Sequence, residues 1–241
     1  MNPDEEYGVQ EGDMMLQRDR NAASDVWPEV DGQVFVPYEI NPELGKRASL
    51  ITQAFKMISE KTCVKFRLHT DEADYLHFKE GPGCASLVGL TGGEQPLLIS
   101  KSCTAGNICH EILHALGFYH EHSRKDRNEY ITIQYDNISP GREDNFEVRY
   151  GKTLGMAYDR GSIMHYGEDY FSRNGKPTIV TKDGNVKIGQ RTHLSDLDVE
   201  RIRKLYHCKG NEEEGTAQVD YGDYEMGLEG LWGFKFSTMA L

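Results

Sequence analysis

The amino-acid sequence predicts an α+β fold, with strands and helices in its first half and a less regular second half that ends in a helix. Three observations predict it: an alternating apolar pattern near residue 35, a helical apolar pattern directly after it, and short β-rich pieces that lead into a second helix. The chain has 241 residues, of which 38% are hydrophobic, so it can form one domain of about 190 residues with a proper core.

The N-terminal half contains alternating strand and helix patterns. Apolar residues alternate over 34–38 and predict a strand, which the turn-forming pair Asn41-Pro42 ends. From Leu44 to Ile58, apolar residues recur at steps of four and three, which predicts an amphipathic helix that packs on a sheet. Further β-rich pieces, the last of which leads directly into a second helix, are 64–68, 75–78 and 97–100.

Regular pattern is sparse in the rest of the chain. The glycine-dense segment 81–93 predicts a loop beside an edge strand. Ser195 can cap a final helix, which we expect to end at Cys208 and whose apolar side chains are Leu197, Ile202, Leu205 and Tyr206.

Both ends of the chain are acidic. The net charge is −12: residues 1–20 hold six acids and two bases, residues 209–241 hold seven acids and two bases, and −3 remains for the domain between them. This balance provides no basic patch for nucleic acid, and no stretch approaches the roughly 20 apolar residues of a membrane span. We expect the segment 209–241 to be disordered or lightly docked.

The second helix carries the pattern H-E-x-x-H-x-x-G-x-x-H between His110 and His120. On a helix, His110 and His114 are one turn apart and present two imidazoles on one face, with Glu111 beside them. A helix continued to His120 would place the third ring about 15 Å along the axis, so the chain must turn at Gly117, which can adopt the left-handed conformation. Three neutral nitrogen donors suit a zinc site with one open position. The alternative is an amphipathic helix with surface histidines.

This pattern predicts hydrolytic chemistry. One Zn²⁺ ion held by the three histidines lowers the pKa of a water in the open position toward about 7. Glu111 is the candidate general base, which takes the proton of this water as its oxygen attacks a peptide carbonyl and then delivers the proton to the leaving amine. The sequence therefore predicts a zinc peptidase.

Two segments resemble one known family. Residues 117–127 resemble the signature of the astacin family, in which Glu follows the third His and an R-x-D-R run comes next. Residues 162–166, Ser-Ile-Met-His-Tyr, resemble the Met-turn of that family. The resemblance spans 21–208 and is strongest to short hatching-enzyme-like or nephrosin-like members. Asn128 departs from it, because the family signature usually continues with Asp.

Membership of the astacin family implies a zinc metalloendopeptidase of the metzincin clan. The implied fold is a twisted mixed sheet with two long helices above the cleft and an irregular lower half, closed by a C-terminal helix. The implied substrates are proteins or peptides.

The same resemblance implies roles for three more residues. Tyr166 is expected to ligate zinc in the resting enzyme and to swing out to hydrogen-bond the oxyanion, the alternative being a buried aromatic residue near the site. Met164 is expected to form an apolar floor under the metal. Glu121 is expected to receive the amino terminus of the mature chain, at Asn21 or Ala22; the alternative is an exposed, salt-bridging glutamate.

The acidic leader, 1–20, resembles the remnant of a pro-segment. Glu11-Gly12-Asp13 resembles the end of the family's F-x-G-D motif, whose Asp occupies the water position on zinc in the latent form. Gln10 replaces the Phe of this motif, so we expect a looser block than in relatives. A trypsin-like protease that cuts near Arg18 or Arg20 would activate the chain. The alternative for Asp13 is an ordinary acid in a disordered leader.

The cysteines resemble an extracellular framework. The resemblance pairs Cys63 with Cys208 and Cys84 with Cys103, and the alternative is reduced thiols in a cytosolic enzyme. Cys109 is left over: its position one step before His110 turns it about 100° away from the metal side, so we expect a small buried core residue. A free reactive thiol, or a partner from outside the domain, is the alternative.

Taken together, the sequence predicts a secreted, monomeric zinc endopeptidase that acts on extracellular proteins. Residues 1–20 lack the basic and apolar regions of a secretory signal, so we expect that Met1 is not the natural start of the precursor or that the signal was left out. A catalytically silent binding or matrix-interaction protein is the alternative, and the complete set of catalytic residues counts against it. The histidines that fit no ligand spacing, expected to be surface or hydrogen-bonded residues, are His69, His77, His122, His165, His193 and His207.

Overall fold

The structure is a computed structural model that describes residues 9–15, 26–184 and 186–209. The predicted activation region around Arg18 and Arg20, the predicted mature amino terminus and the acidic tail from residue 210 onward lie outside the described residues. No helix among the described residues is long and apolar enough to cross a membrane.

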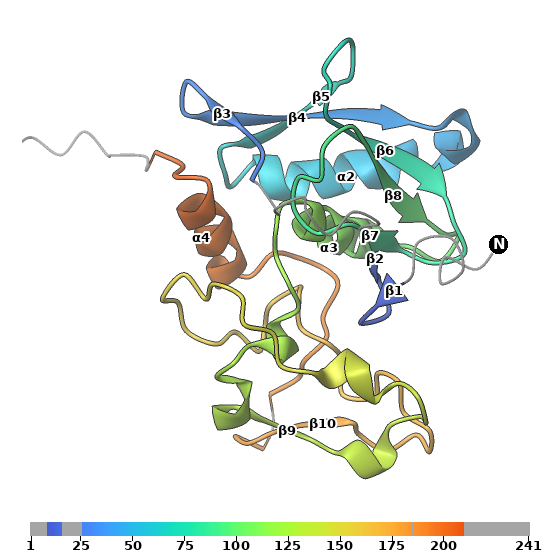
Figure 1. Cartoon of the computed structure of the whole chain (residues 1–241), viewed down its shortest axis with the longest axis vertical. Helices are drawn as coiled ribbons and strands as arrows, with labels where there is room; N and C mark the ends of the chain where they lie inside the picture. Colours follow the sequence, from blue (N-terminus) through green and yellow to red (C-terminus); the bar gives the residue numbers. More distant parts are fainter. Residues whose placement is uncertain (1–8, 16–25, 185, 210–241) are drawn as a thin grey trace, which may run out of the picture. The chain divides into compact units, whose positions relative to one another are not determined.

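An eight-stranded mixed sheet forms the upper part of the domain, with strands in the order β1-β2-β7-β8-β6-β4-β3 and β5 paired to β4 (Figure 1). The pairs of β4 with β5 and β6, of β6 with β8, and of β2 with β7 are parallel. The strands are β1 (Val9–Gln10), β2 (Met14–Met15), β3 (Glu29–Val30), β4 (Gln33–Ile40), β5 (Val64–Leu68), β6 (Tyr75–Glu80), β7 (Ala85–Ser86) and β8 (Glu94–Ile99).

Two helices, α2 (Ala48–Ser59) and α3 (Ala105–Ala115), pack side by side against the sheet (Figure 1). Their apolar faces are buried, and for α2 this confirms the amphipathic pattern that the sequence predicts. The first predicted helix begins later than expected, because Asn41 and Pro42 start a 3₁₀ helix, η1 (Pro42–Arg47), that takes Leu44 into the core before α2 begins.

The segment 81–93 differs from the prediction of a simple loop. It contains β7, and β7 is an interior strand because β2 of the leader pairs with its free side. Without β1 and β2, β7 would be the edge of the sheet. The leader therefore completes the sheet by strand addition.

The second half is irregular, as expected. One two-stranded sheet, of β9 (Ile131–Ile133) and β10 (Ile179–Thr181), encloses a second apolar cluster with nearby loops. Helix α4 (Asp196–Leu205) closes the domain: Ser195 caps it in a capping box with Asp198. The helix ends at Leu205 rather than at Cys208. The short 3₁₀ helices between α3 and α4 are η2 (Glu121–Ser123), η3 (Arg127–Glu129), η4 (Tyr135–Asn137) and η5 (Glu143–Phe146).

The structure contains both expected disulfides. Cys63 and Cys208 tie the end of α4 to the start of β5, with Cα atoms 5.3 Å apart. Cys84 and Cys103 join the β7 region to the turn before α3, with Cα atoms 6.1 Å apart. Cys109 is a free, fully buried thiol in the main core.

Candidate metal centre

The local sequence of α3 explains how two histidines reach one site. Thr104 and Asn107 form a capping box that starts the helix. Gly106 lets its first turn approach the loop that bears Arg191, because a Cβ at this position would lie 1.8 Å from the Arg191 carbonyl oxygen. His110 and His114 lie on the buried face of the helix that starts at this contact.

Gly117 makes the turn that delivers the third histidine. Its φ is +99°, and the amide N–H groups of Gly117 and Phe118 donate to the carbonyl oxygens of His114 and Leu113, at 2.8 and 3.0 Å. These two bonds form a Schellman ending, which a residue without a Cβ adopts at low cost. The chain then returns toward α3 and presents His120.

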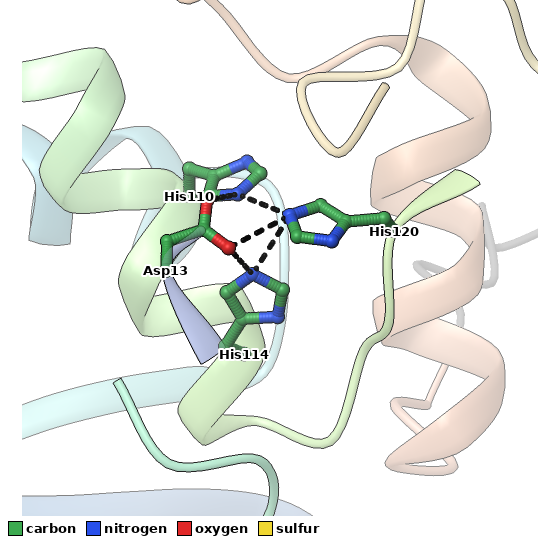
Figure 2. Close-up of side chains that lie close together, drawn as sticks. All are labelled: Asp13, His110, His114 and His120. Atoms are coloured by element: carbon green, nitrogen blue, oxygen red, sulfur yellow. Dashed lines mark hydrogen bonds and ion pairs between the residues drawn. The ribbon is translucent and has the colours of Figure 1, made fainter. Parts of the chain in front are cut away.

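The three imidazoles converge on one point (Figure 2). His120 Nε2 lies 3.1 Å from His110 Nε2 and 3.2 Å from His114 Nε2, and all three side chains are buried. Two nitrogens bound at about 2.0–2.1 Å to a tetrahedral zinc ion lie about 3.3 Å apart. The separations are therefore close to those that zinc requires.

The contacts of the three Nδ1 atoms indicate the direction in which the Nε2 lone pairs point. Each Nδ1 faces an oxygen acceptor: the Ile163 carbonyl at 2.8 Å, the Phe118 carbonyl at 2.7 Å and the Glu11 carboxylate at 2.7 Å. An Nδ1–H that donates to these oxygens leaves a bare lone pair on each Nε2. Three lone pairs that face one another repel unless a cation lies between them, so the donor set fits a zinc ion.

Asp13 provides a fourth donor to this cluster (Figure 2). Its carboxylate oxygens lie 3.2 Å from His110 Nε2, 3.1 Å from His120 Nε2 and 3.6 Å from His114 Nε2. All four ligand atoms lie within 4.8 Å of one another. Burial opposes ionisation of this carboxyl group, but the imidazoles outweigh burial and hold the pKa of Asp13 well below its usual range.

Glu11 is a site residue that the sequence reasoning missed. Its carboxylate accepts hydrogen bonds from His120 Nδ1 and from the Arg149 guanidinium, and its carbonyl accepts one from the Tyr166 hydroxyl. The side chain is 1% exposed, and its φ is +49° in the tight turn between β1 and β2. One signal in the sequence could have identified Glu11, namely its position two residues before Asp13. In the turn between β1 and β2, this spacing points both carboxylates the same way.

The rest of the turn between β1 and β2 also lies close to the domain. Gly12 has φ +77°, and a Cβ there would lie 2.6 Å from the Phe171 ring. Gln10, which stands where the family motif has Phe, is exposed and accepts a hydrogen bond from Arg149 Nη2 at 2.8 Å.

Glu111 lies buried beside the histidines, with 2% of its surface exposed. Its Oε2 atom has no hydrogen-bond partner among the described residues. Burial first, and the charge of Asp13 second, raise the pKa of Glu111 well above its usual range. A buried carboxyl group without a partner is suited to gaining and losing a proton.

The Met-turn is held by α4. Asp198 accepts hydrogen bonds from Ser162 Oγ at 2.5 Å and from the Ile163 amide at 2.9 Å. The Ile163 carbonyl in turn accepts a hydrogen bond from His110 Nδ1, and Met164 is buried in the main core. Asp198 therefore positions a histidine of the cluster through one backbone segment, a link that the sequence did not reveal.

Glu121 is ion-paired, as in the salt-bridging alternative, but it is buried rather than exposed. Arg201 donates two hydrogen bonds to its carboxylate, each of 2.7 Å, and the Asp159 amide donates a third of 2.6 Å. The side chain of Glu121 is 5% exposed. In this leader-bound structure, Arg201 is thus its principal charged partner among the described residues.

Tyr166 is 1% exposed and lies against the cluster. Its ring centroid is 4.6 Å from that of His120 and 3.8 Å from that of His122, on which it stacks. Its hydroxyl donates to the Glu11 carbonyl, so the leader engages the phenol as well as the imidazoles.

Two of the histidines outside the zinc pattern are buried and hydrogen-bonded. His122 Nε2 donates to the Asn145 carbonyl at 2.9 Å, and His165 Nε2 bonds the Tyr158 hydroxyl at 2.7 Å. His122 also lies near Glu11 and His120 in a second group whose ligand atoms are within 4.8 Å of one another. That group is less suited to zinc, because the Arg149 guanidinium already neutralises Glu11.

The fold and these donors define a class of metal centre in which a helix and the loop after it supply three imidazoles around one zinc-sized space. The chain belongs to the astacin family: the model of the Astacin peptidase family matches residues 19–207. The predicted family is therefore confirmed.

Curated proteins with sequences similar to this chain are named as zinc metalloproteinases. The "Zinc metalloproteinase nas-14" of Caenorhabditis elegans is 46% identical over 192 residues, which cover 76% of this chain and 37% of that relative. The "Zinc metalloproteinase nas-4" of the same organism is 42% identical over 202 residues, which cover 79% of this chain and 63% of that relative. The chain thus spans between about a third and two thirds of the length of these curated relatives.

A solved structure is also similar. It is "High choriolytic enzyme 1 (HCE-1), a hatching enzyme zinc-protease from Oryzias latipes", with a TM-score of 0.75 and 37% sequence identity. The match covers 80% of this chain and 99% of that chain. The predicted fold class is therefore confirmed as well.

Proposed function

We propose that this chain is a secreted, zinc-dependent endopeptidase that hydrolyses peptide bonds in extracellular proteins and is made in a latent form. The observation that carries the proposal is the convergence of three Nε2 atoms whose Nδ1 atoms are all engaged, next to the unpartnered carboxyl group of Glu111. Membership of a peptidase family supports the same reaction class.

The histidines at 110, 114 and 120 would hold one Zn²⁺ ion per chain. When bound, zinc supplies Lewis-acid chemistry, which makes a water more acidic and a carbonyl more electrophilic. Glu111 accepts a proton from the attacking water and passes it to the leaving amine. Burial, the larger of the two causes that raise the pKa of Glu111, does not depend on Asp13 and favours holding that proton between the two transfers.

Tyr166 acts as a hydrogen-bond donor in this proposal. Burial raises the pKa of its phenol well above the usual value, so the hydroxyl keeps its proton at neutral pH. Here it donates to the Glu11 carbonyl; once the leader is gone, the same O–H can donate to the oxygen of a substrate carbonyl.

Latency follows from the leader. Asp13 takes the donor position opposite the three histidines, and β2 is held in the sheet by the Ser86 amide, which donates to the Asp13 carbonyl at 2.9 Å. Cleavage by a trypsin-like protease near Arg20 would let this segment leave. The released amino terminus would then compete with Arg201 for Glu121.

Secretion and a monomeric state belong to the same proposal. The two disulfides support an oxidising compartment, because such bonds persist outside the cytosol. The silent, binding-only alternative has less support, because the histidines, Glu111 and Tyr166 are all in place.

The test compares the cut wild-type chain with Glu111→Ala. We expect equal zinc content in both, cleavage of a denatured protein by the wild type alone, and loss of both zinc and cleavage after treatment with a strong chelator. Cleavage that persists in Glu111→Ala, or in the chelated wild type, would disprove the proposed mechanism.

A further inference from the structure

We propose that Glu11 is a positioning residue for the metal centre and that, through His120, it raises the affinity of the latent chain for zinc. The leader therefore retains the metal as well as covering it, and its removal weakens the hold on zinc. The inference rests on the proposed zinc site and goes beyond the proposed reaction, because it concerns how firmly the metal is bound.

The three histidines of the centre differ in the partner of their Nδ1 atoms. Those of His110 and His114 face backbone carbonyl oxygens of the domain, at 2.8 and 2.7 Å. His120 Nδ1 instead faces the carboxylate of Glu11 at 2.7 Å, and both of these side chains are fully buried. Of the three histidines, His120 is thus the one whose outer partner is an acid, and this acid belongs to the leader.

A carboxylate behind a histidine strengthens that histidine as a metal ligand. Its negative charge draws the Nδ1 proton outward, which raises the electron density at Nε2, and the hydrogen bond fixes the tautomer and the orientation of the ring. A carbonyl oxygen also fixes the tautomer but carries no net charge. Outer partners of metal ligands contribute about 10–100-fold to metal affinity.

Arg149 makes the burial of this carboxylate possible. A buried carboxylate is costly without a partner, and the Arg149 guanidinium donates to the second oxygen of Glu11, which leaves the first oxygen for His120. The Arg149 side chain is 30% exposed, so water screens part of its charge, whereas the pair of Glu11 and His120 is shielded from water. The hydrogen bond to His120 is therefore charge-assisted and unscreened.

The leader turn holds Glu11 in place through contacts of the neighbouring backbone. The Glu11 carbonyl accepts a hydrogen bond from the Tyr166 hydroxyl, and the Ser86 amide donates to the carbonyl of Asp13 at 2.9 Å. Met14 and Met15 follow directly and are each only 3% exposed. The carboxylate is therefore aimed at His120 by a turn that is fixed to the domain on both sides.

The domain offers no equivalent acid once the leader has gone. Among the described residues, two groups of potential ligands include His120, and their acids, Asp13 and Glu11, both come from the leader. The other member of the second group is His122, whose Nε2 lies 2.9 Å from the Asn145 carbonyl. A neutral imidazole or a water in the place of Glu11 carries no charge. The affinity for zinc should therefore fall on activation by more than the loss of Asp13 alone accounts for.

The test measures zinc binding by the uncut full chain. Zinc-loaded wild type, Glu11→Gln and Gln10→Ala are titrated with a colorimetric chelator, which gives the affinity and the rate of zinc release. Gln10→Ala is the matched control, because Gln10 also contacts Arg149 but is exposed and, within the described chain, forms no hydrogen bond with His120. We expect Glu11→Gln to bind zinc about tenfold more weakly, at the low end of the range because its amide oxygen can still accept, and Gln10→Ala to match the wild type.

Two further readouts separate a lost hydrogen bond from a loosened leader. In the NMR spectrum of the zinc-loaded chain with isotope-labelled histidine, the Nδ1–H signal of His120 should lie further downfield than those of His110 and His114, and Glu11→Gln should shift this signal alone. The uncut Glu11→Gln chain should also remain as inactive on a fluorogenic peptide as the uncut wild type, because Asp13 still covers the centre.

A trypsin cut near Arg20 completes the comparison. After the leader has been removed, the wild type and Glu11→Gln have the same sequence, and both should bind zinc more weakly than the uncut wild type. Equal zinc affinity of the two uncut chains, or an unchanged affinity after the cut, would overturn the inference and leave the proposed function intact. Weaker binding together with peptidase activity of the uncut Glu11→Gln chain would also overturn it, since Glu11 would then only anchor the leader. A chain that holds zinc as expected but cleaves no protein after the cut would overturn the proposed function alone.

Discussion

The two disulfides should differ in their contribution to stability because they close loops of very different length. Cys63 and Cys208 are 145 residues apart, and Cys84 and Cys103 are 19 apart. In the loop-entropy treatment, the long loop contributes about 5 kcal/mol and the short one about 3 kcal/mol. The difference of about 2 kcal/mol depends on loop length alone.

Side-chain packing predicts the opposite order. Cys103 is 2% exposed and contacts Ser100, whereas Cys63 and Cys208 are only partly buried. If packing dominated, the pair Cys84→Ala/Cys103→Ala would lose more stability. The two effects can therefore be separated in one comparison.

The assay is reversible urea unfolding of the full chain and of the two double-alanine variants, monitored by circular dichroism. We expect Cys63→Ala/Cys208→Ala to lose about 2 kcal/mol more than Cys84→Ala/Cys103→Ala, which corresponds to a melting temperature lower by roughly 4 to 7 °C. A greater loss in the short-loop variant would refute the reasoning from chain entropy.

Three further outcomes are expected from the site. Tyr166→Phe should lower kcat by about 10²–10³-fold, less than Glu111→Ala, because the phenol is one of two groups that stabilise charge on the carbonyl oxygen; equal losses in a fluorogenic peptide assay would give Tyr166 another role. Cys109 should resist thiol reagents in the native chain, since burial raises the pKa of its thiol, and mass spectrometry should find one labelled thiol only after unfolding; labelling of the native chain would contradict this. Asp13→Ala should raise the activity of the uncut chain and leave the chain cut after Arg20 unchanged, whereas a wild-type chain equally active before and after the cut would show that Asp13 does not block the centre.

Much of the fold could be predicted because its signals are local. The strand at 33–40, the helices that became α2, α3 and α4, and the turn at Gly117 each arise from periodicity, capping residues or a glycine within a few positions. The boundary of α2 was missed because Asn41 and Pro42 favour a 3₁₀ turn over the first turn of an α-helix.

The leader hairpin gave no such signal. Strands β1 and β2 have two residues each, too few for an alternating pattern, and they exist because β7 offers an unpaired edge. The buried carboxylate of Glu11 has its partners far away in the chain: Arg149 is 138 residues away and His120 is 109 residues away.

The contacts that position the centre are equally remote in sequence. Arg201 reaches Glu121 across 80 residues, and Asp198 reaches Ile163 across 35. Ion pairs and hydrogen bonds between residues so far apart in the chain produce no periodic pattern in a single sequence. They had to be read from the structure.

The central claim is that one zinc ion lies between three histidines and is covered by the leader. Crystals of the full chain grown with zinc, measured at the zinc absorption edge, test it most directly. We predict one strong anomalous peak per chain, about 2.0–2.1 Å from the Nε2 atoms of His110, His114 and His120 and in contact with the Asp13 carboxylate. A peak instead among Glu11, His120 and His122, or no peak with the three histidines in place, would contradict the account.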